Sequence, residues 1–261
     1  NGTAGEFYNQ TEPEFDAIQL LLAEKCRRSG MKFQIGVSHT NPLIMMDRVI
    51  RTRSLKPDAF QVILPDWVPL NENEQLLFLQ KVADAAVDIP LILYNPPHAK
   101  KVLKPEQLKQ LQEAIPSLIG VKLASGDQTW FQDMAWSKEV FSVFVPGHRL
   151  ASGFSTGIAN GSYSNMACLS PLGSQAWWQL MQKDITAALE IETRIIQFFE
   201  ECIIPFIHKG YSNPALDKLL AAAGRWSAVG TRLRWPYQWI SEEEAKHTGN
   251  RARYYLPEFF K

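Results

Sequence analysis

The sequence lacks an excess of charge of either sign. Lys+Arg and Asp+Glu both count 27, so the formal net charge is zero. Without a basic excess or blocks of like charge, neither a nucleic acid nor a membrane surface is an expected partner. No apolar run approaches the roughly 20 residues of a membrane span, and the N-terminus lacks a signal-peptide pattern. Small-molecule chemistry is the class of function that these absences leave.

Cysteine is also scarce. Cys26, Cys168 and Cys202 lie far apart and are odd in number. This pattern excludes a disulfide framework and a zinc knuckle, and it predicts a protein of the reducing cytoplasm. No G-x-G-x-x-G follows any apolar run, so the usual mark of a dinucleotide-binding open sheet is missing.

What the sequence does contain is a regular alternation of short apolar runs and amphipathic helices. The apolar runs are continuous, as is typical of strands covered on both faces. They are Phe33–Ser38, Ala59–Leu64, Pro90–Tyr94, Leu118–Ala124, Phe141–Val145 and Gly161–Asn165. Alternation of this kind predicts a parallel sheet in the α/β class. Without a dinucleotide motif, and with 261 residues, a (β/α)8 TIM barrel is favoured over an open sheet.

Both ends of the chain depart from a complete barrel. Only six strand candidates are present, and Asn1-Gly2-Thr3 reads as the end of a strand. We therefore expect the first β/α unit to be missing from this chain, and an open barrel with exposed strand edges would be prone to aggregation. We divide the chain into a barrel with the active site over 1–170, and a last barrel helix with a helical C-terminal extension over 171–261.

Helix signals support this outline. Thr11 and Glu14 have the spacing of a capping box that opens the first helix, and another helix is predicted to begin at Pro105. In the C-terminal part we expect one long helical stretch over Gln175–Phe199. Further helices are predicted over Pro214–Ala223 and from Ser241 onward.

Lys122 is the most informative candidate for chemistry. It lies inside the apolar run Leu118–Ala124, and lysine is rarely buried because desolvating an ammonium costs several kcal/mol. Burial lowers the pKa of a lysine, and a neutral amine is what attack on a carbonyl requires. The alternative is an edge-strand lysine whose aliphatic stem packs while its ammonium reaches water.

Tyr94 ends the strand that precedes the one carrying Lys122. One β/α unit separates the two residues, so they should lie at matching heights on adjacent strands about 4.8 Å apart. A phenol there would relay protons, although an aromatic side chain that merely fills the barrel fits the same pattern. The turn Gly2-Thr3-Ala4-Gly5-Glu6 offers backbone N–H groups and the Thr3 hydroxyl to a carboxylate, but a G-x-x-G alone is often only a turn.

Together these segments resemble the dihydrodipicolinate synthase and N-acetylneuraminate lyase family of class I Schiff-base aldolases. The resemblance rests on three segments in order: Gly2-Thr3-Ala4-Gly5-Glu6, Tyr94-Asn95-Pro96-Pro97 and Gly120-Val121-Lys122-Leu123-Ala124-Ser125-Gly126-Asp127. It implies that Lys122 forms a Schiff base with pyruvate or another 2-keto acid, that Tyr94 relays protons, and that the Gly2–Gly5 turn binds the carboxylate. It also implies no metal or cofactor and a homo-oligomer, a tetramer or a dimer.

Several positions depart from the family pattern. Ala4 replaces a second hydroxyl residue, and Asp66-Trp67 stand where the synthase branch has a tyrosine pair. The arginine that this branch uses to hold the second substrate is replaced by Ala99, beside His98, and lysine is no equivalent for a bidentate arginine. We take Asp66, Trp67 and His98 as candidate substrate contacts.

Another candidate contact, Tyr163, lies in the variable segment Gly153–Ser164. The departures favour an aldolase or dehydratase acting on a 2-keto acid. A true dihydrodipicolinate synthase, which condenses pyruvate with aspartate semialdehyde, is one alternative. A non-catalytic 2-keto-acid-binding protein is another, although binding alone needs neither Lys122 nor Tyr94.

Overall fold

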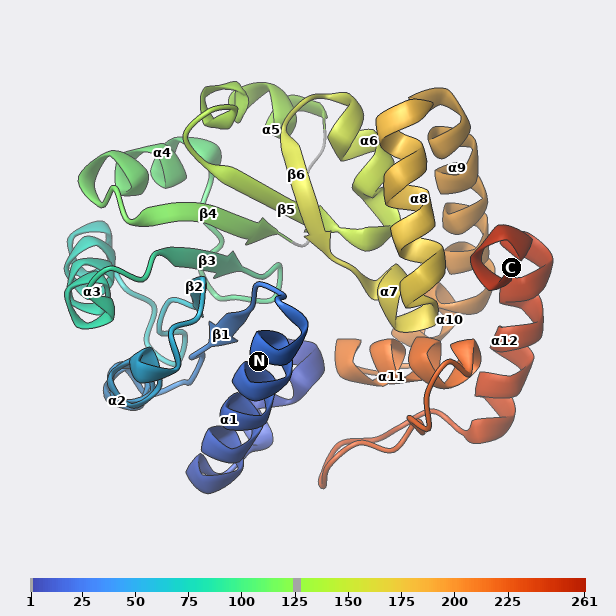
Figure 1. Ribbon diagram of the computed structural model, residues 1–261, viewed down its shortest axis with the longest axis horizontal. Helices are drawn as coiled ribbons and strands as arrows, with labels where there is room; N and C mark the ends of the chain where they lie inside the picture. Colours follow the sequence, from blue (N-terminus) through green and yellow to red (C-terminus); the bar gives the residue numbers. More distant parts are fainter. Residues whose placement is uncertain (1, 124–127) are drawn as a thin grey trace. The chain divides into compact units, whose positions relative to one another are not determined.

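The computed structural model describes residues 2–123 and 128–261, and its strands follow one another in one sheet in sequence order (Figure 1). They are β1 (Gln34–Gly36), β2 (Ala59–Val62), β3 (Leu91–Asn95), β4 (Leu118–Leu123), β5 (Ser142–Pro146) and β6 (Ala159–Tyr163). From β1 to β5 each pairing is parallel. All six predicted strands are confirmed. The predicted strand residue Ala124 and the motif residues Ser125, Gly126 and Asp127 lie outside the described residues.

The chain divides into two compact units, residues 1–144 and 145–261. The first unit contains β1 to β4 and the first three residues of β5. The second contains the end of β5, β6 and the C-terminal helices. The boundary at residue 170 that the sequence indicates falls within the second unit, and it stays a prediction.

Helices connect the strands of the first unit. They are α1 (Glu12–Ser29), α2 (Pro42–Thr52), α3 (Glu72–Ala86), α4 (Pro105–Ala114) and α5 (Gln128–Asp133), with short 3-10 helices η1 (Thr3–Gly5), η2 (Phe7–Asn9), η3 (Arg53–Leu55) and η4 (Ala135–Ser137). The predicted capping box is confirmed, because the Glu14 N–H donates to Thr11 Oγ1 and the Thr11 N–H donates to Glu14 Oε2 over 3.0 Å. The helix predicted at Pro105 is α4.

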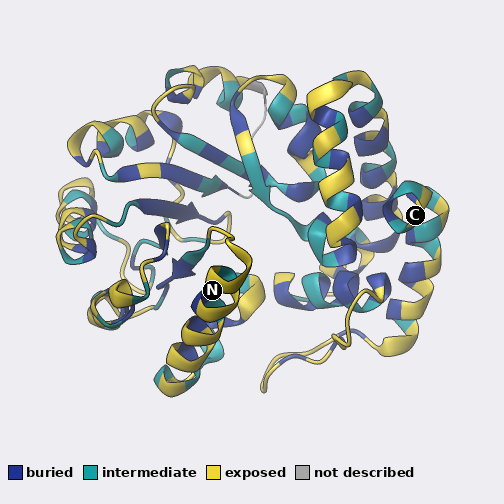
Figure 2. Cartoon of the chain, in the orientation of Figure 1, coloured by how far each residue is buried: buried dark blue, intermediate teal, exposed yellow. Residues whose placement is uncertain are grey.

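The core of the first unit lies on both sides of the sheet. Every residue of β2 and of β3 is buried (Figure 2), which explains why these strands read as continuous apolar runs. Arg48 of α2 is also fully buried. Its guanidinium donates to Glu12 of α1 over 2.7 Å and lies 4.3 Å from the centre of the Phe15 ring. This charged contact fixes α1 against α2.

The second unit is mostly helical. It contains η5 (Gly147–Arg149), α6 (Leu150–Ser155), α7 (Asn165–Leu169), α8 (Pro171–Lys183), α9 (Ile185–Cys202), α10 (Ile204–His208), α11 (Asn213–Gly224), α12 (Glu242–Tyr255) and η6 (Pro257–Phe260). The prediction of one helical stretch over Gln175–Phe199 is wrong, because the chain breaks at Asp184. There the carboxylate accepts the Ala187 N–H over 3.0 Å and caps the start of α9. The helices expected over Pro214–Ala223 and after Ser241 are confirmed as α11 and α12.

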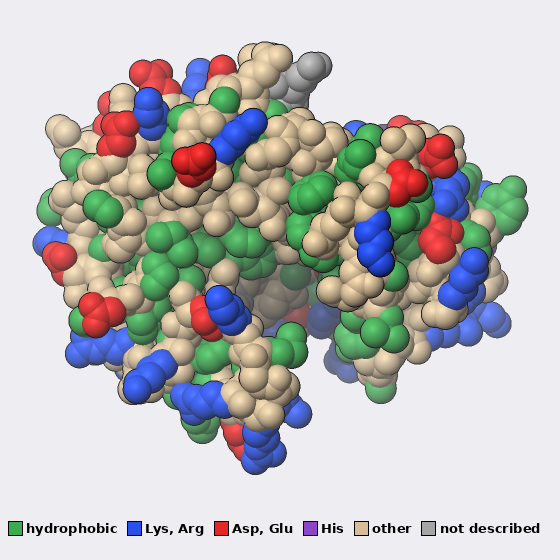
Figure 3. Space-filling view, turned by 45° about the horizontal axis from the view of Figure 1, so that its top comes forward, with side chains coloured by type: hydrophobic (Ala, Val, Ile, Leu, Met, Phe, Trp, Pro, Cys, Tyr) green, Lys and Arg blue, Asp and Glu red, His purple; other side chains and the backbone are tan. Residues whose placement is uncertain are grey.

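The surface carries both signs of charge. Figure 3 shows Lys or Arg and Asp or Glu side chains over the visible face, with hydrophobic side chains between them. Within the described parts of the chain, no helix is both long and apolar enough to cross a bilayer.

Candidate active site

Tyr94 and Lys122 meet on adjacent strands. They are register partners across β3 and β4, as their spacing predicts. Lys122 Nζ lies 4.0 Å from the centre of the Tyr94 ring, within the range of a cation–π contact. Tyr94 is buried, whereas Lys122 is half-buried. The amine is thus held against an aromatic face at the carboxyl end of the strands, where barrel enzymes carry their active sites.

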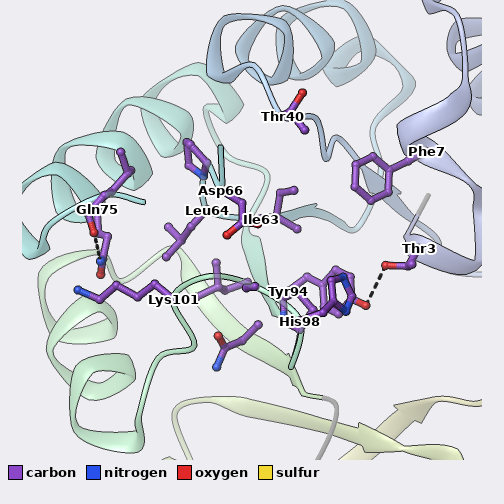
Figure 4. Close-up of a pocket in the computed structure, with 16 residues that line it drawn as sticks. Thr3, Phe7, Thr40, Ile63, Leu64, Asp66, Gln75, Tyr94, His98 and Lys101 are labelled. Carbon is purple, nitrogen blue, oxygen red and sulfur yellow. Dashed lines mark hydrogen bonds between the residues drawn. The ribbon is translucent and has the colours of Figure 1, made fainter. Parts of the chain in front are cut away.

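The N-terminal turn lies against this pair. Thr3 Oγ1 is 3.0 Å from the Tyr94 hydroxyl, a distance for a hydrogen bond in either direction (Figure 4). A Cβ added to Gly2 would lie 3.3 Å from Lys122 Nζ. Gly2 has an extended backbone with φ of −113°, so the absence of a side chain here provides room beside the amine rather than backbone freedom. The structure therefore brings Gly2, Thr3, Tyr94 and Lys122 together.

The same turn forms a 3-10 helix, η1, rather than an open loop. The Gly5 N–H donates to the Gly2 carbonyl over 3.0 Å and the Glu6 N–H to the Thr3 carbonyl over 2.9 Å. Because these two groups are used within the turn, the backbone donors left for a carboxylate are those of Gly2, Thr3 and Ala4. Ala4 and Gly5 are both exposed, and their contact with substrate stays a prediction.

Asp66 has a structural partner. Its Oδ1 accepts the Lys100 N–H over 2.7 Å, and Lys100 Nζ donates to the Trp67 carbonyl over 2.8 Å. These bonds join the loop after β2 to the loop after β3. The Trp67 side chain is 79 % exposed and lies under the Lys100 ammonium, 5.3 Å from it. Asp66 therefore positions the loops, and a role for it in proton transfer would have to use the other carboxylate oxygen.

A pocket opens where these loops meet the strand ends. It has a volume of about 130 Å³, several times the space that one water needs. Its walls come from the N-terminal turn and from the segments after β1, β2 and β3: Thr3, Phe7, Thr40, Ile63, Leu64, Pro65, Asp66, Leu70, Gln75, Leu93, Tyr94, Asn95, Pro96, His98, Ala99 and Lys101. The predicted contacts Thr3, Asp66 and His98 line it, and Trp67 does not.

The pocket is polar at both ends. Figure 4 shows Thr3 and Tyr94 at one end and Gln75 and Lys101 at the other. Gln75 Nε2 donates to the Leu70 carbonyl over 2.7 Å. Sequence reasoning missed Gln75 and Lys101. For Lys101, nothing in the pattern indicates which of the adjacent residues Lys100 and Lys101 faces the pocket.

Asn95 supports the loop after β3. Its amide donates to the Leu103 carbonyl over 2.9 Å and accepts the Leu103 N–H over 3.0 Å. A buried amide with both ends bonded fixes the backbone around it. Asn95 thereby holds the start and the end of the segment that carries His98 and Lys101.

Tyr163 ends β6 in the second unit and is half-buried, directly before the residue that caps α7. Its contact with substrate stays a prediction. In the same unit His148 stacks on Phe199 with ring centres 4.8 Å apart and pairs with Asn165 over 2.9 Å. Burial, with Arg149 nearby, lowers the pKa of His148 to about 4. His148 is a neutral packing residue.

The comparisons with known proteins agree with this architecture. An uncharacterized DapA-like lyase of Pyrococcus furiosus is 25 % identical over 252 residues, which cover 93 % of this chain and 82 % of the relative. The Escherichia coli K12 prophage protein YagE, solved in complex with pyruvate, superposes with a TM-score of 0.83 at 20 % identity, covering 97 % of this chain and 85 % of its own.

A third similar protein is N-acetylneuraminate lyase from Mycoplasma synoviae, with a TM-score of 0.76 at 20 % identity, covering 100 % of this chain and 84 % of its own. The two solved structures show the fold, and they confirm the TIM-barrel class that the sequence predicts. A profile of the Dihydrodipicolinate synthetase family matches residues 51–252, most of the chain. The chain belongs to the Dihydrodipicolinate synthetase family, whose members are lyases.

Proposed function

We propose that the protein is a class I lyase that binds pyruvate or another 2-keto acid as a Schiff base on Lys122. The observation that carries the proposal is the contact of Lys122 Nζ with the Tyr94 ring at 4.0 Å, with Thr3 at the Tyr94 hydroxyl. A half-buried amine beside a phenol and a second hydroxyl combines a nucleophile with a proton relay. The pyruvate complex of YagE supports a keto-acid ligand.

The reaction follows from these groups. The neutral Lys122 amine attacks the ketone, a carbon–nitrogen bond forms, and the carbonyl oxygen takes a proton to give a carbinolamine. Tyr94, hydrogen-bonded to Thr3, then delivers a proton to the hydroxyl, which leaves as water and yields a protonated imine. The imine accepts the electron pair of a carbon–carbon bond on the adjacent carbon when that bond breaks, or of a carbon–hydrogen bond there whose proton is removed. Either step gives an enamine, whose adjacent carbon then takes up a proton to restore the imine. Water later releases the product and restores the amine.

The pocket gives the substrate its direction. With its ketone at Lys122, a 2-keto acid would extend past Tyr94 toward Lys101 and Gln75 (Figure 4). Ala99 offers no bidentate grip on a carboxylate. This favours an aldolase or dehydratase that acts on another 2-keto acid over a true dihydrodipicolinate synthase. We retain the cytoplasm and a homo-oligomer as predictions.

Borohydride trapping tests the proposal. Incubation with pyruvate and borohydride should give a single reduced adduct on the peptide that contains Lys122. Lys122→Ala should give none, while Lys109→Ala, which changes a surface lysine of α4, should trap as the unmodified protein does. A folded protein that forms no adduct with pyruvate or with a panel of 2-keto acids would contradict the lyase. If it still bound those acids by calorimetry, a non-catalytic binding protein would be supported instead.

A further inference from the structure

Gln61 is a buried polar residue whose side chain has no role in the fold or in the reaction described above. It lies in β2, where every residue is buried, and it is 3 % exposed. Burying an amide costs free energy unless a hydrogen bond compensates for it. A glutamine in the middle of a covered strand therefore calls for a partner.

Two other buried amides of the first unit, those of Asn95 and Gln75, have such partners, whereas the amide of Gln19 in α1 has none. Asn95 bonds the Leu103 backbone at both ends, and Gln75 donates to the Leu70 carbonyl. Within residues 2–123 and 128–261, no hydrogen bond joins the Gln61 side chain to another protein group. Its amide is thus free to bind a ligand, whereas the amides of Asn95 and Gln75 are committed to the loops.

The position of Gln61 is next to the candidate site. Gln61 pairs with Ile92 in the register of β2 and β3, two residues before Tyr94. Since side chains alternate along a strand, Gln61, Tyr94 and Lys122 project from the same face of the sheet. A Cβ added to Gly2 would lie 3.3 Å from Lys122 Nζ and 3.5 Å from Gln61 Nε2. The amine and the amide therefore flank one point beside Gly2.

That the Gln61 side chain is polar but uncharged is as informative as its position. The Tyr94 phenol on β3 is a titratable group beside Lys122. Phe144, its partner on β5, carries no charge. Gln61 adds an amide that accepts from an amine and donates to an oxygen. A carboxylate at this position would favour the ammonium, the form that cannot attack a ketone.

We propose that Gln61 is a positioning residue of the lysine site, whose amide lies beside the Lys122 amine and binds the oxygen of the keto-acid adduct formed there. The inference rests on the proposed Schiff-base function. Gly2 belongs to the same arrangement, because a side chain at that position would occupy the point that the two nitrogens share.

Competitive labelling of Lys122 tests this without any substrate. Reaction with isotopic acetic anhydride at a series of pH values, read by peptide mass, gives the pKa of the amine. In Gln61→Glu the new carboxylate should raise this pKa by about one unit or more, which leaves about tenfold less neutral amine near pH 7. In Gln61→Met, close in volume to glutamine, loss of the polar neighbour should lower the pKa and slow pyruvate trapping several-fold.

A matched control is available in Gln19 of α1. This side chain is fully buried and its amide has no hydrogen-bond partner, so Gln19→Met changes the same chemistry away from the lysine and should leave labelling unaltered. If Gln61→Glu fails to fold, Gln61→Met carries the test alone. Labelling that is the same in folded Gln61 variants and in the unmodified protein would overturn the proposal. Labelling shifts in a protein that traps no keto acid would support the contact and contradict the Schiff-base function instead.

Discussion

At the scale of single residues, the candidate site depends on how Tyr94 is held. Thr3 is 3.0 Å from its hydroxyl, and the Lys122 ammonium lies over its ring. Thr3 thus holds the hydroxyl of Tyr94, while the Tyr94 ring orients the Lys122 ammonium. If Tyr94 relays protons as proposed, the oxygen matters for catalysis and the ring matters for the position of the amine.

Tyr94→Phe separates these two roles. The variant keeps the ring and removes the proton relay, a contribution of about 10²- to 10⁴-fold in rate. We expect pyruvate trapping to slow by a factor in this range while the adduct stays on Lys122. Thr3→Val, which removes only the neighbouring hydroxyl, should have a smaller effect. The measurement is the pseudo-first-order rate of adduct formation. Equal rates for Tyr94→Phe and the unmodified protein would exclude the relay.

Gly2 offers a test of space. A Cβ at 3.3 Å from Lys122 Nζ is tight but leaves the flexible lysine able to shift by a few tenths of an ångström. We therefore predict that Gly2→Ala folds with an unchanged thermal midpoint and traps pyruvate at least several-fold more slowly. Leu20→Ala, at an exposed position of α1, is the control that should leave trapping intact. A Gly2→Ala protein with normal trapping would show that the site lies elsewhere.

At the scale of elements, two loops set the pocket. Asp66 and Lys100 join the segment after β2 to the segment after β3, and Asn95 closes the latter segment on Leu103. Lys101 is the cation that this arrangement leaves facing the pocket. Among the described residues no acid pairs with it, so its charge is available for an anionic group of the substrate.

Lys101→Met tests that charge. The variant keeps the length of the side chain and removes the ammonium, so it should raise KM for a substrate that carries a second carboxylate by about tenfold, the loss of one charge-assisted contact. Trapping of pyruvate, which carries no second carboxylate, should be unchanged. Lys100→Met serves as the comparison because Lys100 turns toward Trp67. An equal loss for short and long keto acids would show that Lys101 acts on the fold and not on the substrate.

The sequence predicts elements well where a physical signal is local. The capping box at Thr11 and the apolar runs of β2 and β3 follow from helix and strand chemistry, and the register of Tyr94 and Lys122 follows from one β/α repeat. The break at Asp184 is missed because apolar periodicity continues across it. Lys100 and Lys101 cannot be told apart from the sequence, because the direction of Lys100 is set by its tertiary contact with Trp67. Gln61 is missed because a single polar residue does not interrupt an apolar pattern.

At the scale of the whole molecule, both units contain groups whose pKa depends on folding. In the first unit Glu12 accepts from Arg48 and Arg51, and these guanidinium groups, against the opposing effect of burial, hold its pKa below its usual value. In the second unit burial lowers the pKa of His148 to about 4. A carboxyl with a depressed pKa is a source of stability that is lost as pH falls through its folded value. A histidine with a depressed pKa also destabilises the fold on acidification, because only the unfolded chain takes up the proton readily.

The histidine effect has its own pH window. Between the ordinary pKa of 6.5 and the folded value of about 4, the unfolded state binds more protons than the folded state, so stability falls as pH falls. A difference of this size corresponds to roughly 3 kcal/mol once the window has been crossed. We expect urea unfolding of the unmodified protein to weaken steeply between pH 6.5 and 4. His148→Gln, which retains a partner for Asn165, should flatten this dependence while costing some stability at pH 7.

His208→Gln is the matched control for this measurement, since His208 ends the short helix α10 in the same unit. Its replacement should leave the pH dependence of unfolding as it is. The carboxyl of Glu12 contributes at lower pH, as protonation approaches its depressed pKa, so its loss should add to acid unfolding below the window of the histidine. A His148→Gln protein with the same slope between pH 6.5 and 4 would place the acid sensitivity in groups other than His148. The Glu12 and Arg48 contact of the first unit would then be the next group to change.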